Sequence, residues 1–144
     1  MSAFNRQSAA RALARRLAVQ ALYRWQLNPT PWQDLWQEFS ADKDMPRADQ
    51  DYFRALIEQV STQQAALDMA LAPLLDRKPV SLDPIEHAVL LIAAFELRER
   101  HEVPFRVVID EAVSLTRRFG ATDGHKFVNG VLDRAARAWR PNEH

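Results

Sequence analysis

Residues 82–97, LDPIEHAVLLIAAFEL, are the most informative stretch of this sequence. Asp83 followed by Pro84 is typical of a helix start, with an acidic cap and a proline at the first helical position. Glu86, three residues after the aspartate, completes the pattern of a capping box. The centre of the stretch, Ala88–Phe95, is apolar on nearly every side, and a helix of that kind is buried. The stretch therefore predicts a helix that forms the core of the molecule.

Helical spacing of apolar residues continues on both sides of this core helix. Three glycines stand in 144 residues, and no alternating pattern with a hairpin turn is present. We expect further helices over residues 8–27, 31–39, 47–62, 65–75 with a bend near Pro73, 104–119, and one that follows a cap at Asp123. The sequence predicts an all-α fold, a compact bundle of about six or seven helices in two small packed lobes, 1–76 and 82–144.

Composition excludes several classes of protein. The chain has no cysteine, and so holds no disulfide, thiolate zinc site, iron–sulfur cluster or cysteine nucleophile. Its longest apolar run has eight residues, whereas a membrane-spanning helix needs about 18. The first residues lack the apolar core of a secretory signal. We expect a soluble, cytoplasmic protein that does not bind a membrane.

No motif for catalysis or metal binding is complete. Residues 120–126 suggest a phosphate-binding loop, but Phe127 stands where a magnesium-binding Ser or Thr is needed. The four histidines are scattered, without a pair at ligand spacing on one helix face. Asp110 and Glu111 are adjacent and point in different directions on a helix. We therefore expect no enzyme, no metal and no cofactor.

Charge is distributed unevenly along the chain, although its formal sum is zero. Residues 1–33 carry +5, residues 34–102 carry −7, and residues 103–144 carry +2. Basic ends on either side of an acidic middle predict that a positive face forms in the folded protein, since local fields matter more than the sum.

Arginines of the first predicted helix are the strongest signal of a ligand in the residues themselves. Arg11 and Arg15 lie one helical turn apart, and Arg6 extends outward in a segment that we expect to be disordered in the free protein. Such a group neutralises phosphates in salt-dependent RNA binding. The alternative is a basic face that is only solvated.

A second candidate surface lies on the same predicted helix, away from its main apolar arc. Val19 and Tyr23 stand beside Arg16 on an otherwise polar side. An aliphatic and an aromatic residue in that setting predict an exposed protein-contact face, or a homodimer when no partner is available. The alternative is that a second helix packs on this side and makes it internal.

A third candidate lies at the start of the last predicted helix. Lys126 and Phe127 follow the cap, where free N–H groups and the helix dipole suit a phosphate. The charge of Asp123 opposes a phosphate at this place. Phe127 is a base-stacking residue or, given its spacing with Val131, a core residue.

Four blocks of the sequence resemble the NusB family of transcription antitermination factors. The resemblance covers nearly the whole chain in the same order, and the last block is the most specific. The blocks are RRLAVQALYRWQ (Arg15–Gln26), LDPIEHAVLLIAAFEL (Leu82–Leu97), VPFRVVIDEAVSLTRRFG (Val103–Gly120) and HKFVNGVLDRAAR (His125–Arg137).

This resemblance implies an all-helical fold of two lobes and a function without chemistry. It implies that the chain binds boxA-type single-stranded RNA together with ribosomal protein S10 (NusE). The pair acts within the RNA polymerase antitermination complex and promotes processive transcription of ribosomal RNA operons. Two alternatives keep the fold: an accessory in ribosomal RNA processing, and a module that binds only protein.

Position by position, the resemblance implies two RNA-facing segments and one partner-facing surface. RNA-facing positions are Arg11, Arg15, Asp123, Lys126 and Phe127, with Arg6 beside them. Partner-facing positions are Tyr23 and Glu86, with Arg16 and Val19 beside Tyr23. The chain departs from the family in having Ala12, Leu13 and Ala14 where members often carry a denser arginine run. We therefore expect RNA binding that depends more strongly on the partner.

Overall fold

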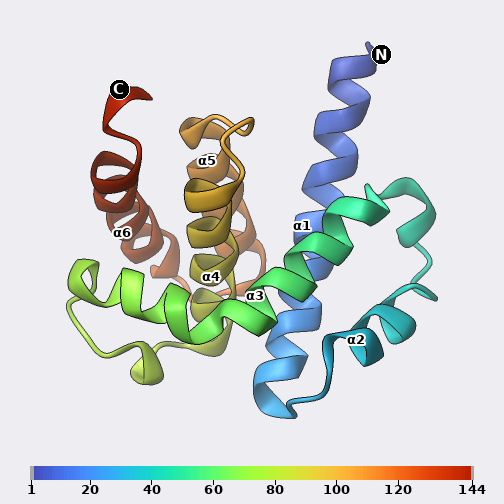
Figure 1. Cartoon of the computed structure of the whole chain (residues 1–144), viewed down its shortest axis with the longest axis horizontal. Helices are drawn as coiled ribbons and strands as arrows, with labels where there is room; N and C mark the ends of the chain where they lie inside the picture. The colour runs from blue at the N-terminus through green and yellow to red at the C-terminus, as the bar shows by residue number, and fades with distance from the viewer. Residues whose placement is uncertain (1, 144) are drawn as a thin grey trace. The chain divides into compact units, whose positions relative to one another are not determined.

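The computed structural model describes residues 2–143, which form helices and connecting turns without a strand (Figure 1). The all-α fold class is confirmed. The α-helices are α1 (Ala3–Leu27), α2 (Trp32–Phe39), α3 (Gln50–Leu71), α4 (Pro84–Glu99), α5 (Phe105–Phe119) and α6 (Gly124–Trp139). Short 3-10 helices are η1 (Met45–Arg47), η2 (Ala72–Leu74), η3 (Pro79–Ser81) and η4 (Pro141–Glu143). Within the described range, no helix combines the length and the apolar character needed to cross a bilayer.

Two compact units make up the chain, Met1–Thr62 and Gln63–His144. The boundary lies within α3, earlier than the sequence predicts with lobes of residues 1–76 and 82–144. The prediction of two helices over 47–62 and 65–75 is wrong, because α3 runs through without interruption. Thr62 and the two glutamines after it are compatible with a helix, so nothing local breaks it. Pro73 lies beyond the end of α3, in η2.

In the first unit, α1 begins at Ala3, earlier than expected. The hydroxyl of Ser2 accepts a hydrogen bond from the N–H of Asn5 at 3.1 Å and caps the helix. Arg6 therefore lies in a helix, and the prediction of a disordered segment around it is wrong. Helices α1 and α2 pack against each other, and Phe53 of α3 is fully buried in this unit.

In the second unit, α4 is the core helix, as its sequence predicts. Every residue from Glu86 to Leu97 is buried. The Asp83 carboxylate accepts hydrogen bonds from the N–H groups of Ile85 and Glu86 at 3.1 and 3.2 Å, and Pro84 occupies the first turn. Helices α4, α5 and α6 pack against one another and lie side by side in Figure 1.

A buried arginine holds the C-terminal end of α4. The side chain of Arg140 is 2% exposed, and it donates hydrogen bonds at 2.5–3.0 Å to four backbone carbonyls at the end of the helix and in the turn that follows. These carbonyls belong to Glu96, Leu97, Arg100 and Val103. Glu143 balances the charge at 3.0 Å and also accepts the N–H of Phe105, the first residue of α5, at 2.7 Å.

Candidate nucleic-acid and partner interfaces

Arg11 and Arg15 lie over one aromatic ring, that of Tyr52 in α3. Their guanidinium carbons are 4.4 and 5.4 Å from the ring centroid. We call Arg11, Arg15, Asp49 and Tyr52 the Tyr52 cluster. Arg11 also pairs with Asp49 at 3.5 Å, and 20% of its side chain is exposed. A planar guanidinium with an exposed part can still reach a phosphate.

Arg15 differs from Arg11, although the sequence groups the two. It is 2% exposed, so its side chain faces the interior of the first unit and not a ligand. The prediction that Arg15 meets RNA directly is not supported by this position. Arg15 is four residues after Arg11, so helical spacing places both on the same side of α1. At the position of Arg15, however, α3 covers this side. Arg6, one turn before the cluster, lies where all described residues from 2 to 9 are exposed.

The surface around Tyr23 is smaller than the sequence predicts. Val19 is fully buried, so the prediction of an exposed face that includes Val19 is wrong. A homodimer interface on this side of α1 would therefore not contain Val19. Buried positions extend beyond the main apolar arc of α1 to Arg15 and Val19, and both α2 and η1 pack on this helix. Tyr23 is 37% exposed, and Arg16 pairs with Asp44 at 2.8 Å.

Acidic side chains of the middle segment neutralise the basic N-terminal helix inside the first unit. The sequence predicts a positive face from the arginines of residues 1–33. In the structure, three arginines of α1 pair with carboxylates from residues 38–49. The pairs are Arg11–Asp49, Arg16–Asp44 and Arg24–Glu38. An RNA phosphate must therefore compete with a carboxylate for Arg11, which lowers the affinity that this helix can supply alone.

The start of α6 carries a second group with an aromatic ring and cations. Arg77, which sequence reasoning missed, places its guanidinium carbon 4.3 Å from the centroid of the Phe127 ring. Phe127 is half-buried, while its neighbour Val128 is fully buried and belongs to the core. We call Arg77, Asp123, Lys126 and Phe127 the Phe127 cluster. Phe127 is thus only partly buried, unlike Val128.

Asp123 occupies the N-cap position of α6 but does not act as its cap. Among the described residues, no backbone N–H of α6 donates to its side chain. It pairs instead with Lys126 at 3.4 Å, and both side chains are largely exposed. The predicted position of the cap is right, because α6 begins at the next residue, but the expected capping hydrogen bond from the side chain is not formed.

Glu86 is buried against the beginning of α6. A Cβ atom added at Gly124 would lie 3.1 Å from Oε2 of Glu86 and 3.2 Å from Cγ2 of Thr116, so the close approach requires glycine. The Glu86 carboxylate accepts no hydrogen bond from the Asp83 N–H within the described chain, so the second half of the expected capping box is not formed. Burial raises the pKa of Glu86, the charge of Asp83 raises it further, and Arg77 lowers it.

We expect Glu86→Gln to increase the free energy of unfolding at neutral pH. Because burial raises the pKa of Glu86 in the folded state, its contribution to stability is present below the unfolded pKa and is lost as the pH rises through the folded pKa. The gain from the variant should therefore be largest at about pH 7 and vanish at about pH 4. Urea unfolding at several pH values checks this, with exposed Glu99→Gln as the control for one lost charge. A gain that is the same at every pH would contradict it.

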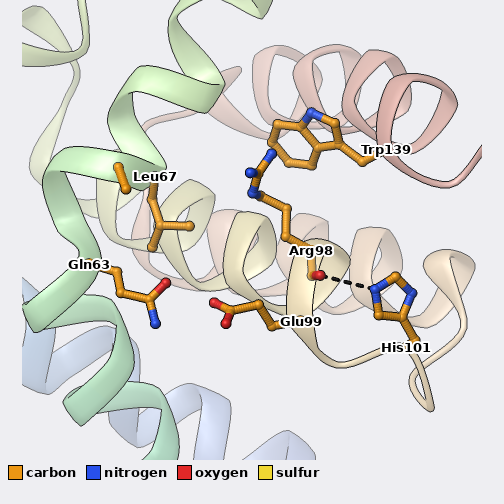
Figure 2. A pocket seen from close by; sticks show the side chains of 7 residues that line it. Gln63, Leu67, Arg98, Glu99, His101 and Trp139 are labelled. Carbon is orange, nitrogen blue, oxygen red and sulfur yellow. Dashed lines mark hydrogen bonds between the residues drawn. The ribbon is translucent and has the colours of Figure 1, made fainter.

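An open groove of about 520 Å³ lies in the second unit and contains none of the predicted site residues (Figure 2). Residues Gln63, Ala66, Leu67, Arg98, Glu99, His101 and Trp139 line it. The Arg98 guanidinium lies 5.0 Å from the Trp139 ring centroid, and His101 contacts the carbonyl of Arg98 at 3.0 Å. Trp139 ends α6, roughly 20 Å along the helix from Lys126. The groove is therefore separate from the Phe127 cluster.

Neither cluster contains the groups of a catalytic or metal centre. Among residues 2–143, no three or more His, Asp or Glu side chains are grouped so that they could hold a metal ion. What both clusters offer is an aromatic ring beside cations. That combination suits the bases and phosphates of a single-stranded nucleic acid.

Comparisons with known proteins agree with one another. Residues 12–137 match the NusB family. A protein of Idiomarina loihiensis named Transcription antitermination protein NusB is 50% identical over 133 residues, which are 92% of this chain and 96% of that protein. A protein of Citrobacter koseri with the same name is 50% identical over 135 residues, 94% and 97% of the two chains. The solved structure of T. maritima NusB has a TM-score of 0.79 at 27% identity and covers 92% of this chain and 94% of its own.

Proposed function

The chain belongs to the NusB family, and from this premise we propose that it is a transcription antitermination factor. In this proposal it binds boxA-type single-stranded RNA together with ribosomal protein S10 (NusE) and helps RNA polymerase to transcribe ribosomal RNA operons processively. It acts by assembling a complex and performs no chemistry. The observation that carries the RNA-binding part is the Phe127 cluster, where a partly buried phenylalanine stands next to an exposed lysine.

RNA contacts are proposed in both units. In the first unit they come from Arg6 and the exposed part of Arg11. In the second unit Lys126 meets a phosphate and Phe127 stacks on a base. Carboxylates accompany the cations at 3.4–3.5 Å, Asp49 at Arg11 and Asp123 at Lys126. These ion pairs support an affinity for RNA that is modest in the isolated protein and increases with the partner.

The protein partner is proposed to bind at Tyr23, with Arg16 beside it. Tyr23 is an exposed aromatic residue on α1, and tyrosine is enriched at protein interfaces. Val19 is buried and contributes only by packing. Glu86, in the second unit, is mostly covered at the start of α6, so we propose that it contributes little exposed surface to partner binding.

Fluorescence anisotropy of a labelled boxA-like RNA tests the proposal. The RNA is titrated with this protein alone and with purified S10, and a scrambled RNA of equal length is measured in parallel. Tighter, sequence-selective binding in the presence of S10 is the expected result. Equal weak binding to both RNAs, unaffected by S10, would contradict the antitermination function and favour a module that binds only protein.

We expect the double variant Arg6→Ala, Arg11→Ala to weaken RNA binding and to flatten its dependence on salt. Each lost phosphate contact on a single strand lowers the slope of log K against log salt by about 0.7, so the double variant should lose up to about 1.4. Anisotropy titrations at four salt concentrations measure this slope. Arg117→Ala, at an exposed position of α5, is the matched control and should leave the slope unchanged. An unchanged slope in the double variant would remove these arginines from the RNA surface.

Tyr23→Asp is expected to weaken S10 binding at least about tenfold, because it places a charge where an aromatic side chain meets the partner. Helicity measured by circular dichroism should stay the same, since Tyr23 is partly exposed. Isothermal titration with S10 measures the affinity. Met69→Asp introduces the same charge at an exposed apolar position of α3 and should not change it. Normal S10 binding by Tyr23→Asp would move the interface elsewhere.

A further inference from the structure

We infer that Arg77 is an additional RNA-binding residue, whose guanidinium lies over the Phe127 ring and presents its outer edge to an RNA phosphate. The inference rests on the proposed RNA-binding function and adds to it a residue from the connection between α3 and α4. Neither the spacing of the sequence nor the resemblance to the family assigns a role to this position.

Two contacts hold the guanidinium in place. Its carbon lies 4.3 Å from the centroid of the Phe127 ring, the arrangement of a cation–π pair. On one edge, Nε and Nη2 donate to the two carboxylate oxygens of Asp76 at 2.7 and 3.3 Å. The hydrogen bond from Arg77 lowers the pKa of Asp76, so the pair is ionised at neutral pH. The planar group is thus oriented before any ligand arrives.

The segment that carries Arg77 is itself attached to α6. Arg134, on the same helix as Phe127, donates from Nε and Nη2 to the carbonyl of Leu74 at 3.2 and 2.8 Å. On the other side of Arg77, the connection leads into the capped start of α4 at Asp83. Both ends of the connection are therefore anchored, and the position of Arg77 over Phe127 follows from the fold of the second unit.

One edge of the guanidinium is left for a ligand. Among the described residues, Nη1 of Arg77 has no acceptor, and 47% of the side chain is exposed. Arginine has five N–H donors in a rigid fork and binds phosphate with two parallel hydrogen bonds. With Nε and one hydrogen of Nη2 on Asp76, the outer edge keeps two donors that point the same way. This is the geometry that phosphate requires.

The aromatic ring makes this site specific for a nucleic acid strand and not for a free anion. A base that contacts the exposed part of Phe127 brings its phosphates close to the guanidinium of Arg77, which lies over the ring. Lys126, the residue before Phe127, supplies a second cation with 73% of its side chain exposed. Stacking and phosphate binding by neighbouring groups are typical of sites for single-stranded RNA.

The test compares Arg77→Gln with the wild type in the anisotropy assay, with saturating S10 and boxA-like RNA. Arg77→Gln should weaken binding roughly three- to tenfold and lower the salt slope by about 0.7, the value for one phosphate. Arg77→Lys keeps the charge and should retain the slope. Lys78→Gln, at the next exposed position, is the matched control and should change neither quantity.

A double-mutant cycle with Phe127→Leu tests the role of the ring. If the ring positions Arg77, Arg77→Gln should cost less affinity in the Phe127→Leu background than in the wild type. Thermal unfolding followed by circular dichroism shows that each variant is folded. Wild-type affinity and slope in Arg77→Gln, while the wild type binds boxA RNA selectively, would overturn this inference alone. A wild type that does not bind the RNA would overturn the proposed function, and the inference with it.

Discussion

Arg140→Ala should lower the free energy of unfolding by about 3–5 kcal/mol. The side chain is buried, and its removal deletes hydrogen bonds to four backbone carbonyls of the α4 end and the following turn. The carbonyls of Glu96 and Arg100 keep a backbone N–H donor, whereas those of Leu97 and Val103 depend on the guanidinium among the described residues. It also leaves Glu143 without the cation at 3.0 Å. Glu143 accepts the hydrogen bond from the first N–H of α5. The lost contacts therefore affect both the end of α4 and the start of α5.

Urea denaturation measures this effect through the transition midpoint and the slope. Arg137→Ala is the matched control, because Arg137 is exposed and, among residues 2–143, forms an ion pair only with Asp133 one turn away. It should change stability by less than about 0.5 kcal/mol. Arg140→Lys keeps the charge but cannot reach all four carbonyls. Its loss in the free energy of unfolding should therefore lie between those of Arg140→Ala and Arg137→Ala. A loss below about 1 kcal/mol in Arg140→Ala would show that water replaces the guanidinium at this place.

Arg15→Ala should reduce the free energy of unfolding by about 2–3 kcal/mol. Arg15 is 2% exposed and lies over the Tyr52 ring, so the substitution empties a filled place in the first unit. Because the side chain faces the interior, its loss should change the salt slope of RNA binding less than the loss of Arg11 does. The two arginines would then have different roles, one in the structure and one in binding.

Unfolding and RNA binding measured on the same two variants, Arg15→Ala and Arg11→Ala, separate these roles. Arg11→Ala is expected to lose less stability than Arg15→Ala, since 20% of the Arg11 side chain is exposed. It is expected to lower the salt slope of RNA binding more than Arg15→Ala does. Binding is measured well below the melting temperature of both proteins. The opposite pattern, with the larger slope change in Arg15→Ala, would show that Arg15 leaves the interior when RNA binds.

Local signals in the sequence were sufficient for most of the helices. The start of α4 follows from Asp83 and Pro84, and its burial follows from the apolar run at Ala88–Phe95. A cap, a proline and an apolar run act within a few residues of one another, so the chain needs no distant contact to express them. Helix ends without such signals were predicted less well. The continuity of α3 through Thr62 is the main example.

The candidate sites were predicted in part. Resemblance and charge together selected Arg11, Lys126 and Phe127, and the structure leaves each of them at least partly exposed. Helical spacing could not separate Arg15 from Arg11, or Val19 from Tyr23. Which side of a helix becomes internal depends on the elements that pack on it, and these come from distant parts of the chain.

By itself, the sequence determined that this protein is all-helical, that α4 is its core and that it resembles the NusB family. Only the tertiary structure decided that Arg77 covers Phe127, fifty positions along the chain, and that Arg140 holds the end of α4. Helix formation is governed by neighbours within one or two turns, so it can be read from local sequence. Contacts between side chains far apart in the sequence exist only once the helices have packed.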